Sequence, residues 1–126
     1  MNKILLDTDV VINILKKDKI FLDRFFKLLK QDTKFYYNPI IIAEIYAGAF
    51  KKEMKTIEQF FDKLNNIEIC KFTGIQAGKY ANIYKKAYNK IPLEDYLIAS
   101  NAKINDLVLW TNNKKHYPMD DIKLLD

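Results

Sequence analysis

Three carboxylates stand in surroundings that are otherwise apolar. Asp7 ends the apolar run 4–6, Glu44 interrupts the apolar stretch 40–47, and Asp95 shares a helical stripe with the apolar residues of 98–102. An ionised carboxylate on a buried face is costly unless it is paired or bound to a cation. Each acid also has an ordinary interpretation. Asp7 or Asp9 could cap the first helix, Glu44 could pair with a lysine, and Asp95 could be a cap within the first turn of its helix.

A shared divalent cation would satisfy all three acids together. Nearly all of the 21 basic residues are lysines, and Arg24 is the one arginine that could pair with a carboxylate through two hydrogen bonds. The chain has one cysteine and one histidine, which excludes cysteine zinc sites and multi-histidine centres. Oxygen ligands without such a cluster favour Mg²⁺ or Mn²⁺.

Two polar residues follow the last apolar strand of the predicted core. Thr111 can orient a carboxylate by hydrogen bonding, and the amide oxygen of Asn113 offers a neutral ligand for an ion. The alternative is a simple turn, which the sequence Thr-Asn-Asn favours by itself.

Short apolar strands alternate with helices along the chain and must position these residues. We expect strands at 4–6, 34–37, 67–70 and 107–110, with an edge strand at 122–124. We expect helices at 10–17, over a segment capped at 18 with apolar residues at helical spacing through 29, at 40 to about 50, 54–64, 73–88 and 93 to about 104. The helices at 40–50 and 54–64 are expected to form a hairpin. This alternation is typical of a parallel sheet covered on both faces, where ligands bind at the carboxyl ends of strands.

Composition limits the class of protein. With 126 residues, of which 49% are hydrophobic, the chain has the size of one domain spanning 1–126. It lacks the glycine spacing of a phosphate-binding loop, and Glu44 stops the longest apolar run far short of a membrane span. We therefore expect a soluble, cytoplasmic protein. A net charge of +5 is compatible with a polyanionic partner, although abundant lysine is also an ordinary surface feature.

Four motifs, in order and spacing, resemble those of the PIN-domain ribonucleases, and within them the VapC-type toxins of prokaryotic toxin–antitoxin pairs. They are Ile-Leu-Leu-Asp-Thr-Asp at 4–9, Ala-Glu-Ile-Tyr-Ala-Gly at 43–48, Glu-Asp-Tyr-Leu-Ile-Ala at 94–99 and Leu-Trp-Thr-Asn-Asn at 109–113. The resemblance implies a three-layer α/β/α domain with a central, mainly parallel sheet of four to five strands. It also implies a Mg²⁺- or Mn²⁺-dependent endoribonuclease in which a metal-activated water hydrolyses RNA.

Carried over by position, the resemblance makes Asp7, Glu44 and Asp95 the catalytic metal ligands. Asn113 stands where the family often has a further acid, and this departure leaves open whether one or two ions bind. The remaining motif residues have supporting roles, and these are Thr8, Asp9, Glu94 and Thr111.

The resemblance also implies partners. They are an RNA substrate of unspecified type, a cognate antitoxin that covers the helical surface, and a second copy of the chain. Some relatives carry an acid at the position of His116, and we expect this histidine to be a surface or RNA-contacting residue rather than a metal ligand. Lys114 and Lys115 are expected to hold phosphates, although each suits a solvated surface equally well.

Two other functions fit part of the pattern. Asp7-Thr8-Asp9 matches the D-x-D opening of haloacid-dehalogenase-like phosphatases, but that fold would leave Glu44 and Asp95 without roles. The second alternative is a non-catalytic PIN-like domain that binds RNA or protein, which the intact acids disfavour.

Overall fold

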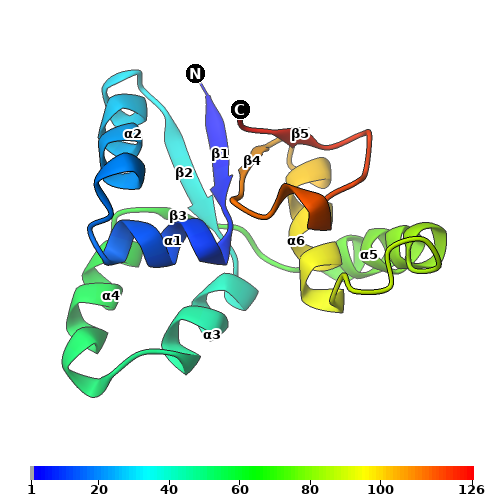
Figure 1. Ribbon diagram of the computed structural model, residues 1–126, viewed down its shortest axis with the longest axis horizontal. Helices are drawn as coiled ribbons and strands as arrows, with labels where there is room; N and C mark the ends of the chain where they lie inside the picture. The colour runs from blue at the N-terminus through cyan, green and yellow to red at the C-terminus, as the bar shows by residue number, and fades with distance from the viewer. Residues whose placement is uncertain (1) are drawn as a thin grey trace.

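The computed structural model describes residues 2–126, and a five-stranded parallel sheet lies at its centre in the order β3-β2-β1-β4-β5 (Figure 1). The strands are β1 (Lys3–Leu6), β2 (Lys34–Tyr37), β3 (Asn65–Asn66), β4 (Val108–Trp110) and β5 (Lys123–Leu124). β1 is the middle strand, and its residues 4–6 are fully buried. An uninterrupted apolar run is what a strand covered on both faces requires.

The strand order reverses beside β1. The chain moves outward from β1 to β2 and β3, and then returns to place β4 and β5 on the other side of β1. In open α/β sheets, such a reversal leaves a crevice at the carboxyl ends of the two central strands, where ligands bind. Asp7 directly follows β1 and Thr111 directly follows β4, so both residues lie at this position.

Helices flank the sheet and complete the three-layer α/β/α architecture that the sequence predicted. They are α1 (Thr8–Leu15), α2 (Lys19–Lys30), α3 (Pro39–Ala47), α4 (Met54–Asp62), α5 (Lys71–Tyr84) and α6 (Leu93–Ile104), with two short 3-10 helices, η1 (Lys51–Glu53) and η2 (Lys114–His116). α5 packs on α6 near β4 and β5, whereas α1 contacts both α2 and α3 (Figure 1). No helix within residues 2–126 is long and apolar enough to cross a membrane.

Side-chain caps explain where the helices near the site begin. The side chain of Asp7 accepts a hydrogen bond from the first amide of α1, and Asp18 accepts one from Ile20 in α2. Asn38 caps α3 by accepting a hydrogen bond from the Ile41 amide at 2.9 Å. Each cap satisfies an amide that has no partner inside its helix.

A buried amide pair joins α3 to α6. The Asn38 side-chain nitrogen donates a hydrogen bond of 2.8 Å to the side-chain oxygen of Asn101, and both residues are fully buried. The start of the helix that carries Glu44 is therefore fixed to the last turn of the helix that carries Asp95.

The third strand and the fifth helix differ from the sequence prediction. The strand expected at 67–70 lies at Asn65–Asn66, and only the amide of Ile67 continues the pairing, by donating to the Tyr37 carbonyl. The helix expected at 73–88 begins earlier, at Lys71, because the Thr73 hydroxyl accepts a hydrogen bond from the Cys70 amide and caps the helix start. It ends at Tyr84, beyond which all side chains to Lys90 are exposed.

The predicted hairpin of the third and fourth helices is also wrong. α3 packs against α1 instead, and an extended segment with η1 separates it from α4 (Figure 1). A cavity of about 550 Å³ lies between these elements, and its lining includes Ile12 of α1, Glu44 of α3 and Ile57 of α4.

Candidate active site

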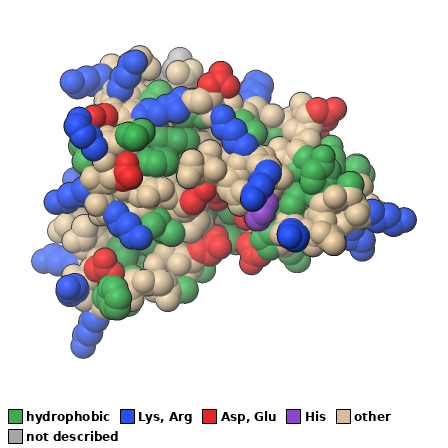
Figure 2. Space-filling view, viewed as in Figure 1, with side chains coloured by type: hydrophobic (Ala, Val, Ile, Leu, Met, Phe, Trp, Pro, Cys, Tyr) green, Lys and Arg blue, Asp and Glu red, His purple; other side chains and the backbone are tan. Residues whose placement is uncertain are grey.

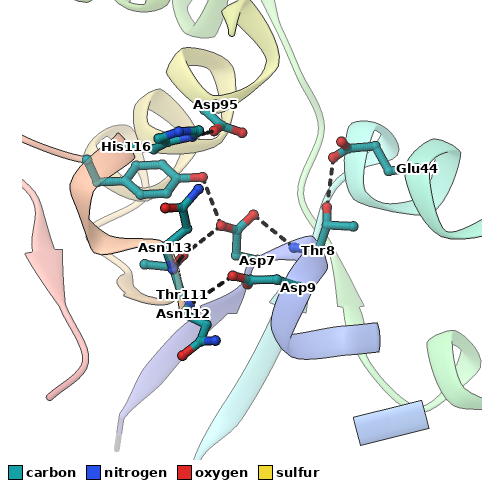
Figure 3. Close-up of polar contacts among 10 residues, drawn as sticks. Asp7, Thr8, Asp9, Glu44, Asp95, Thr111, Asn112, Asn113 and His116 are labelled. Atoms are coloured by element: carbon teal, nitrogen blue, oxygen red, sulfur yellow. Dashed lines mark hydrogen bonds and ion pairs between the residues drawn. The ribbon is translucent and has the colours of Figure 1, made fainter. Parts of the chain in front are cut away.

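Asp7 is the most firmly held acid at the crevice. Its side chain is 7% exposed and accepts three hydrogen bonds. One carboxylate oxygen accepts from the Thr8 amide at 2.8 Å, and the other accepts from the Thr111 hydroxyl at 2.8 Å and the Tyr117 hydroxyl at 3.0 Å (Figure 3). All three donors are uncharged, and no lysine or arginine within residues 2–126 pairs with Asp7. The fold therefore fixes the orientation of this carboxylate without neutralising it.

Asp9 is the second residue of α1 and faces the same crevice (Figure 3). Its Oδ2 accepts a hydrogen bond from the Asn112 amide at 3.1 Å, while its buried Oδ1 has no partner among the described residues. Burial, followed by the charge of Asp7, raises the pKa of Asp9 to about 6. The predicted supporting acid is thus close to Asp7 and has one unused oxygen.

Glu44 approaches the crevice from α3. Its Oε1 accepts a hydrogen bond of 2.7 Å from the Thr8 hydroxyl, which places it across from Asp7 (Figure 3). The expectation that Glu44 lies on a buried face is wrong, because its side chain is exposed beside the cavity. Ile41 and Ile45 form the buried line of α3, and Glu44 lies at the edge of that line.

Asp95 lies in the first turn of α6 and makes a contact that the sequence did not reveal. Its Oδ2 is 2.7 Å from Nδ1 of His116, and both side chains are largely buried (Figure 3). Burial raises the pKa of Asp95, the contact with His116 lowers it, and the charges of Asp7 and Glu44 raise it, with a net increase. The acids of three separate elements therefore influence one another electrostatically.

The segment after β4 connects these acids. The Thr111 hydroxyl donates to Asp7 and accepts a hydrogen bond from the Asn113 amide at 3.0 Å, so Thr111 has the orienting role predicted for it. Asn113 lies at the crevice, half-buried, and its amide side chain has no hydrogen bond within residues 2–126 (Figure 3). That Asn113 binds an ion stays a prediction.

Sequence reasoning missed Tyr117. This tyrosine is 3% exposed, and burial together with the charges of Asp7 and Asp95 raises the pKa of its hydroxyl well above the usual range. The hydroxyl therefore stays protonated and donates to Asp7. An aromatic residue after the turn predicts burial, but no pattern in the sequence indicates that its hydroxyl reaches a carboxylate.

The sequence profile of the PIN domain matches residues 4–122. The chain belongs to the PIN-domain family. Among curated relatives, Ribonuclease VapC1 of Haemophilus influenzae (strain R2866) is 32% identical over 123 residues, covering 90% of this chain and 88% of the relative. Ribonuclease VapC19 of Mycobacterium tuberculosis (strain CDC 1551 / Oshkosh) is 25% identical over 115 residues, covering 91% and 92%.

Solved structures show the same fold. VapBC2 from Rickettsia felis, bound to a DNA fragment from its promoter, aligns with a TM-score of 0.84 at 22% identity, covering 98% of this PIN domain and 97% of that chain. VapBC-1 from nontypeable Haemophilus influenzae aligns with a TM-score of 0.83 at 24% identity and the same coverage. The match to the family excludes the haloacid-dehalogenase-like fold as an alternative.

The remaining predicted residues of the PIN domain lie around the crevice or on its rim. Glu94 is exposed and has no side-chain hydrogen bond within the described part of the chain. Lys114 and Lys115 are exposed on η2, next to His116. Figure 2 shows acidic side chains gathered near the middle of this face beside the single histidine, with basic side chains both next to the histidine and around the periphery.

The donor set of this crevice fits a divalent cation that binds oxygen. Within residues 2–126, no three aspartate, glutamate, histidine or cysteine side chains form a ready-made group around one point. Mg²⁺, however, usually keeps several waters and takes only one or two protein carboxylates together with substrate phosphates. The carboxylates of Asp7 and Asp95, with the unpartnered Oδ1 of Asp9 nearby, supply the kind of ligand that such an ion prefers.

Proposed function

We propose that this PIN domain is a Mg²⁺- or Mn²⁺-dependent endoribonuclease and the toxin of a type II toxin–antitoxin pair. Two curated relatives that match about nine-tenths of the chain carry the name ribonuclease. The observation that carries the proposal is the gathering of Asp7 and Asp95, from β1 and α6, at the reversal of the sheet without a lysine or arginine partner among residues 2–126.

Asp7 and Asp95 would hold the ion, with Glu44 approaching from the opposite wall. A bound divalent cation activates water and neutralises charge on a phosphodiester undergoing hydrolysis. The protein's own contribution is orientation, because the Thr8 amide and the hydroxyls of Thr111 and Tyr117 hold the Asp7 carboxylate in place before substrate arrives. Such preset geometry removes the cost of ordering the ligand during the reaction.

The exposed lysines of η2 would bind the substrate. Lys114 and Lys115 follow the crevice residue Asn113 directly, so phosphates on either side of the cleavage point lie within reach of their long side chains. The uncovered carboxylates would repel RNA in the absence of a cation, and the lysines offset this repulsion.

The test is cleavage of a panel of cellular RNAs by the purified full chain, with Mg²⁺ or Mn²⁺ and with EDTA. We expect cleavage that EDTA abolishes. Asp95→Asn should reduce the cleavage rate by at least about 100-fold, because Asp95 is one of the two carboxylates proposed to hold the ion that stabilises the transition state. Asp23→Asn is the matched control because Asp23 is an exposed acid on α2, and it should cleave like the wild type. Cleavage that persists in EDTA or in Asp95→Asn contradicts the proposal, and absence of cleavage from every RNA favours a non-catalytic binding domain.

A small antitoxin is the protein partner that we propose, acting with this toxin in the cytoplasm. The structural relatives are VapBC complexes, and here an open cavity with apolar walls adjoins Glu44 between α1, α3 and α4. A segment of antitoxin in this cavity would cover the helical surface and obstruct the crevice. Association of two copies of the chain stays a prediction.

A further inference from the structure

One short turn holds two acids that come from distant parts of the chain. Tyr117, the residue after η2, donates to Asp7 at 3.0 Å, and its neighbour His116 contacts Asp95 at 2.7 Å. Figure 3 shows the histidine ring and the Asp95 carboxylate side by side above Asp7. His116 and Tyr117 are neighbours in one turn, and they thus set where the carboxylates of Asp95 in α6 and Asp7 at the end of β1 lie relative to each other.

The two acids are supported very differently. Asp7 accepts three hydrogen bonds, one of them from a backbone amide, and would keep its orientation if any single donor were lost. For the Asp95 carboxylate, His116 is the one hydrogen-bond partner among the described residues. Its orientation therefore depends on a single side chain.

The chemistry of the contact defines the role of each atom. An ionised carboxylate can only accept hydrogen bonds, so Nδ1 of His116 carries the hydrogen and donates it to Oδ2 of Asp95. This leaves Oδ1 of Asp95 without a hydrogen bond inside the described protein and available to a ligand.

We propose that His116 is a positioning residue that orients the Asp95 carboxylate for a divalent cation through its Nδ1–H group. The proposal rests on the proposed function, since it assumes that Asp95 is an ion ligand. It replaces the expected RNA contact as the main role of His116, whose side chain is 23% exposed, unlike the exposed lysines before it. Hydrogen-bond partners of ion ligands act on affinity for the ion without touching it.

Substitutions of His116 can separate a positioning role from simple packing. Asparagine carries its NH₂ group on Cγ, the atom that also bears Nδ1 in histidine, so His116→Asn can still donate from nearly the same place. His116→Gln carries its donor one bond further out, near the position of Nε2, and His116→Ala carries none.

The experiment measures Mn²⁺ affinity of the full chain, without RNA, by electron paramagnetic resonance of free Mn²⁺. We expect His116→Ala to weaken binding by about 10- to 100-fold, His116→Asn to recover most of this loss, and His116→Gln to recover little of it. Lys79→Ala, at an exposed position of α5 to which no role is assigned, is the control and should bind Mn²⁺ like the wild type. Melting temperatures in EDTA, where no ion is bound, report any loss of packing in each variant separately from the loss of Mn²⁺ affinity.

Specific results would overturn the proposal. Wild-type affinity in His116→Ala, or equal losses in the Ala, Asn and Gln variants with lower melting temperatures in EDTA, would show that His116 has only a packing role. Asp95→Asn serves as the reference: if it loses Mn²⁺ affinity and His116→Ala does not, only the positioning role fails. If Asp7→Asn and Asp95→Asn both bind Mn²⁺ normally, the proposed metal-dependent function fails as well.

Discussion

Removing the buried amide that joins α3 to α6 should destabilise the protein by an amount that the structure allows us to estimate. Asn38 does two things at once: its side-chain oxygen caps α3 at 2.9 Å, and its side-chain nitrogen donates to Asn101 at 2.8 Å. In Asn38→Ala the loss of the cap costs about 1 kcal/mol. The buried oxygen of Asn101, left without its donor, costs about 1–3 kcal/mol more.

The expected total is about 2–4 kcal/mol, a large part of the 5–15 kcal/mol by which an ordinary domain is stable. Urea unfolding of the full chain in EDTA measures this loss as the difference in the free energy of unfolding between variant and wild type. Both curves are fitted with the same dependence of that free energy on urea concentration. Asn82→Ala is the matched control, because Asn82 is an exposed asparagine in α5 and should change the free energy of unfolding by less than about 0.5 kcal/mol.

A double-mutant cycle tests the reasoning itself. If the Asn38–Asn101 hydrogen bond carries the effect, Asn101→Ala should cost less in the Asn38→Ala background than in the wild type, with a coupling energy of at least about 0.5 kcal/mol. Zero coupling, or a loss below about 1 kcal/mol in Asn38→Ala, would refute the interpretation that this pair fixes the two helices together.

Three further predictions follow from the site and its surroundings. Tyr117→Phe removes a buried donor to a carboxylate and should lower the free energy of unfolding in EDTA by about 1–2 kcal/mol in urea titrations; an unchanged value would contradict the buried hydrogen bond. The double substitution of Lys114 and Lys115 by Ala should raise KM for RNA and reduce the salt dependence of RNA binding by about two counterions, whereas an unchanged salt slope would exclude phosphate contacts there. Ile12→Asp in the cavity wall should weaken binding of the cognate antitoxin by at least about tenfold in calorimetry; Ile83→Asp, an exposed isoleucine of α5 outside the cavity, should not, and equal effects would reject this docking site.

The sequence predicted the fold well where burial controls the pattern. The strands that contain Leu5 and Leu109 are covered by other elements, so apolar residues must run along them, and such runs are visible in the sequence. β3 was misplaced because its two asparagines are exposed at the edge of the sheet and form no apolar run, although the Asn65 side chain also donates a hydrogen bond to the Phe35 carbonyl of β2. Ile67 and Ile69 are both partly buried, and Ile67 packs against the core, so their alternation reflects burial more than strand pairing, which ends at the Ile67 amide.

The sequence predicted which acids lie at the site, but it did not predict the side chains that hydrogen-bond to them. Strand ends and helix starts fix where Asp7 and Asp95 lie, and both features can be read from apolar runs and turn residues. The contact of His116 with Asp95 and of Tyr117 with Asp7 depends on how the segment after Asn113 folds back over the crevice. No local pattern encodes that path, because it is set by packing between residues far apart in the chain.

The overall charge of the protein has a different meaning once the site is located. A net charge of +5 describes a surface on which lysines outnumber acids, and taken alone it indicates only that a polyanion is tolerated. The crevice has the opposite sign, because, beyond the effect of burial, the negative charge of Asp7 raises the pKa of both Asp9 and Asp95. A polyanion drawn to the lysines of η2 would therefore meet repulsion at the point where the carboxylates gather. A divalent cation at that point would remove the repulsion and would supply a Lewis acid for phosphodiester hydrolysis, so the proposed function predicts that binding of RNA and its cleavage depend on the same ion.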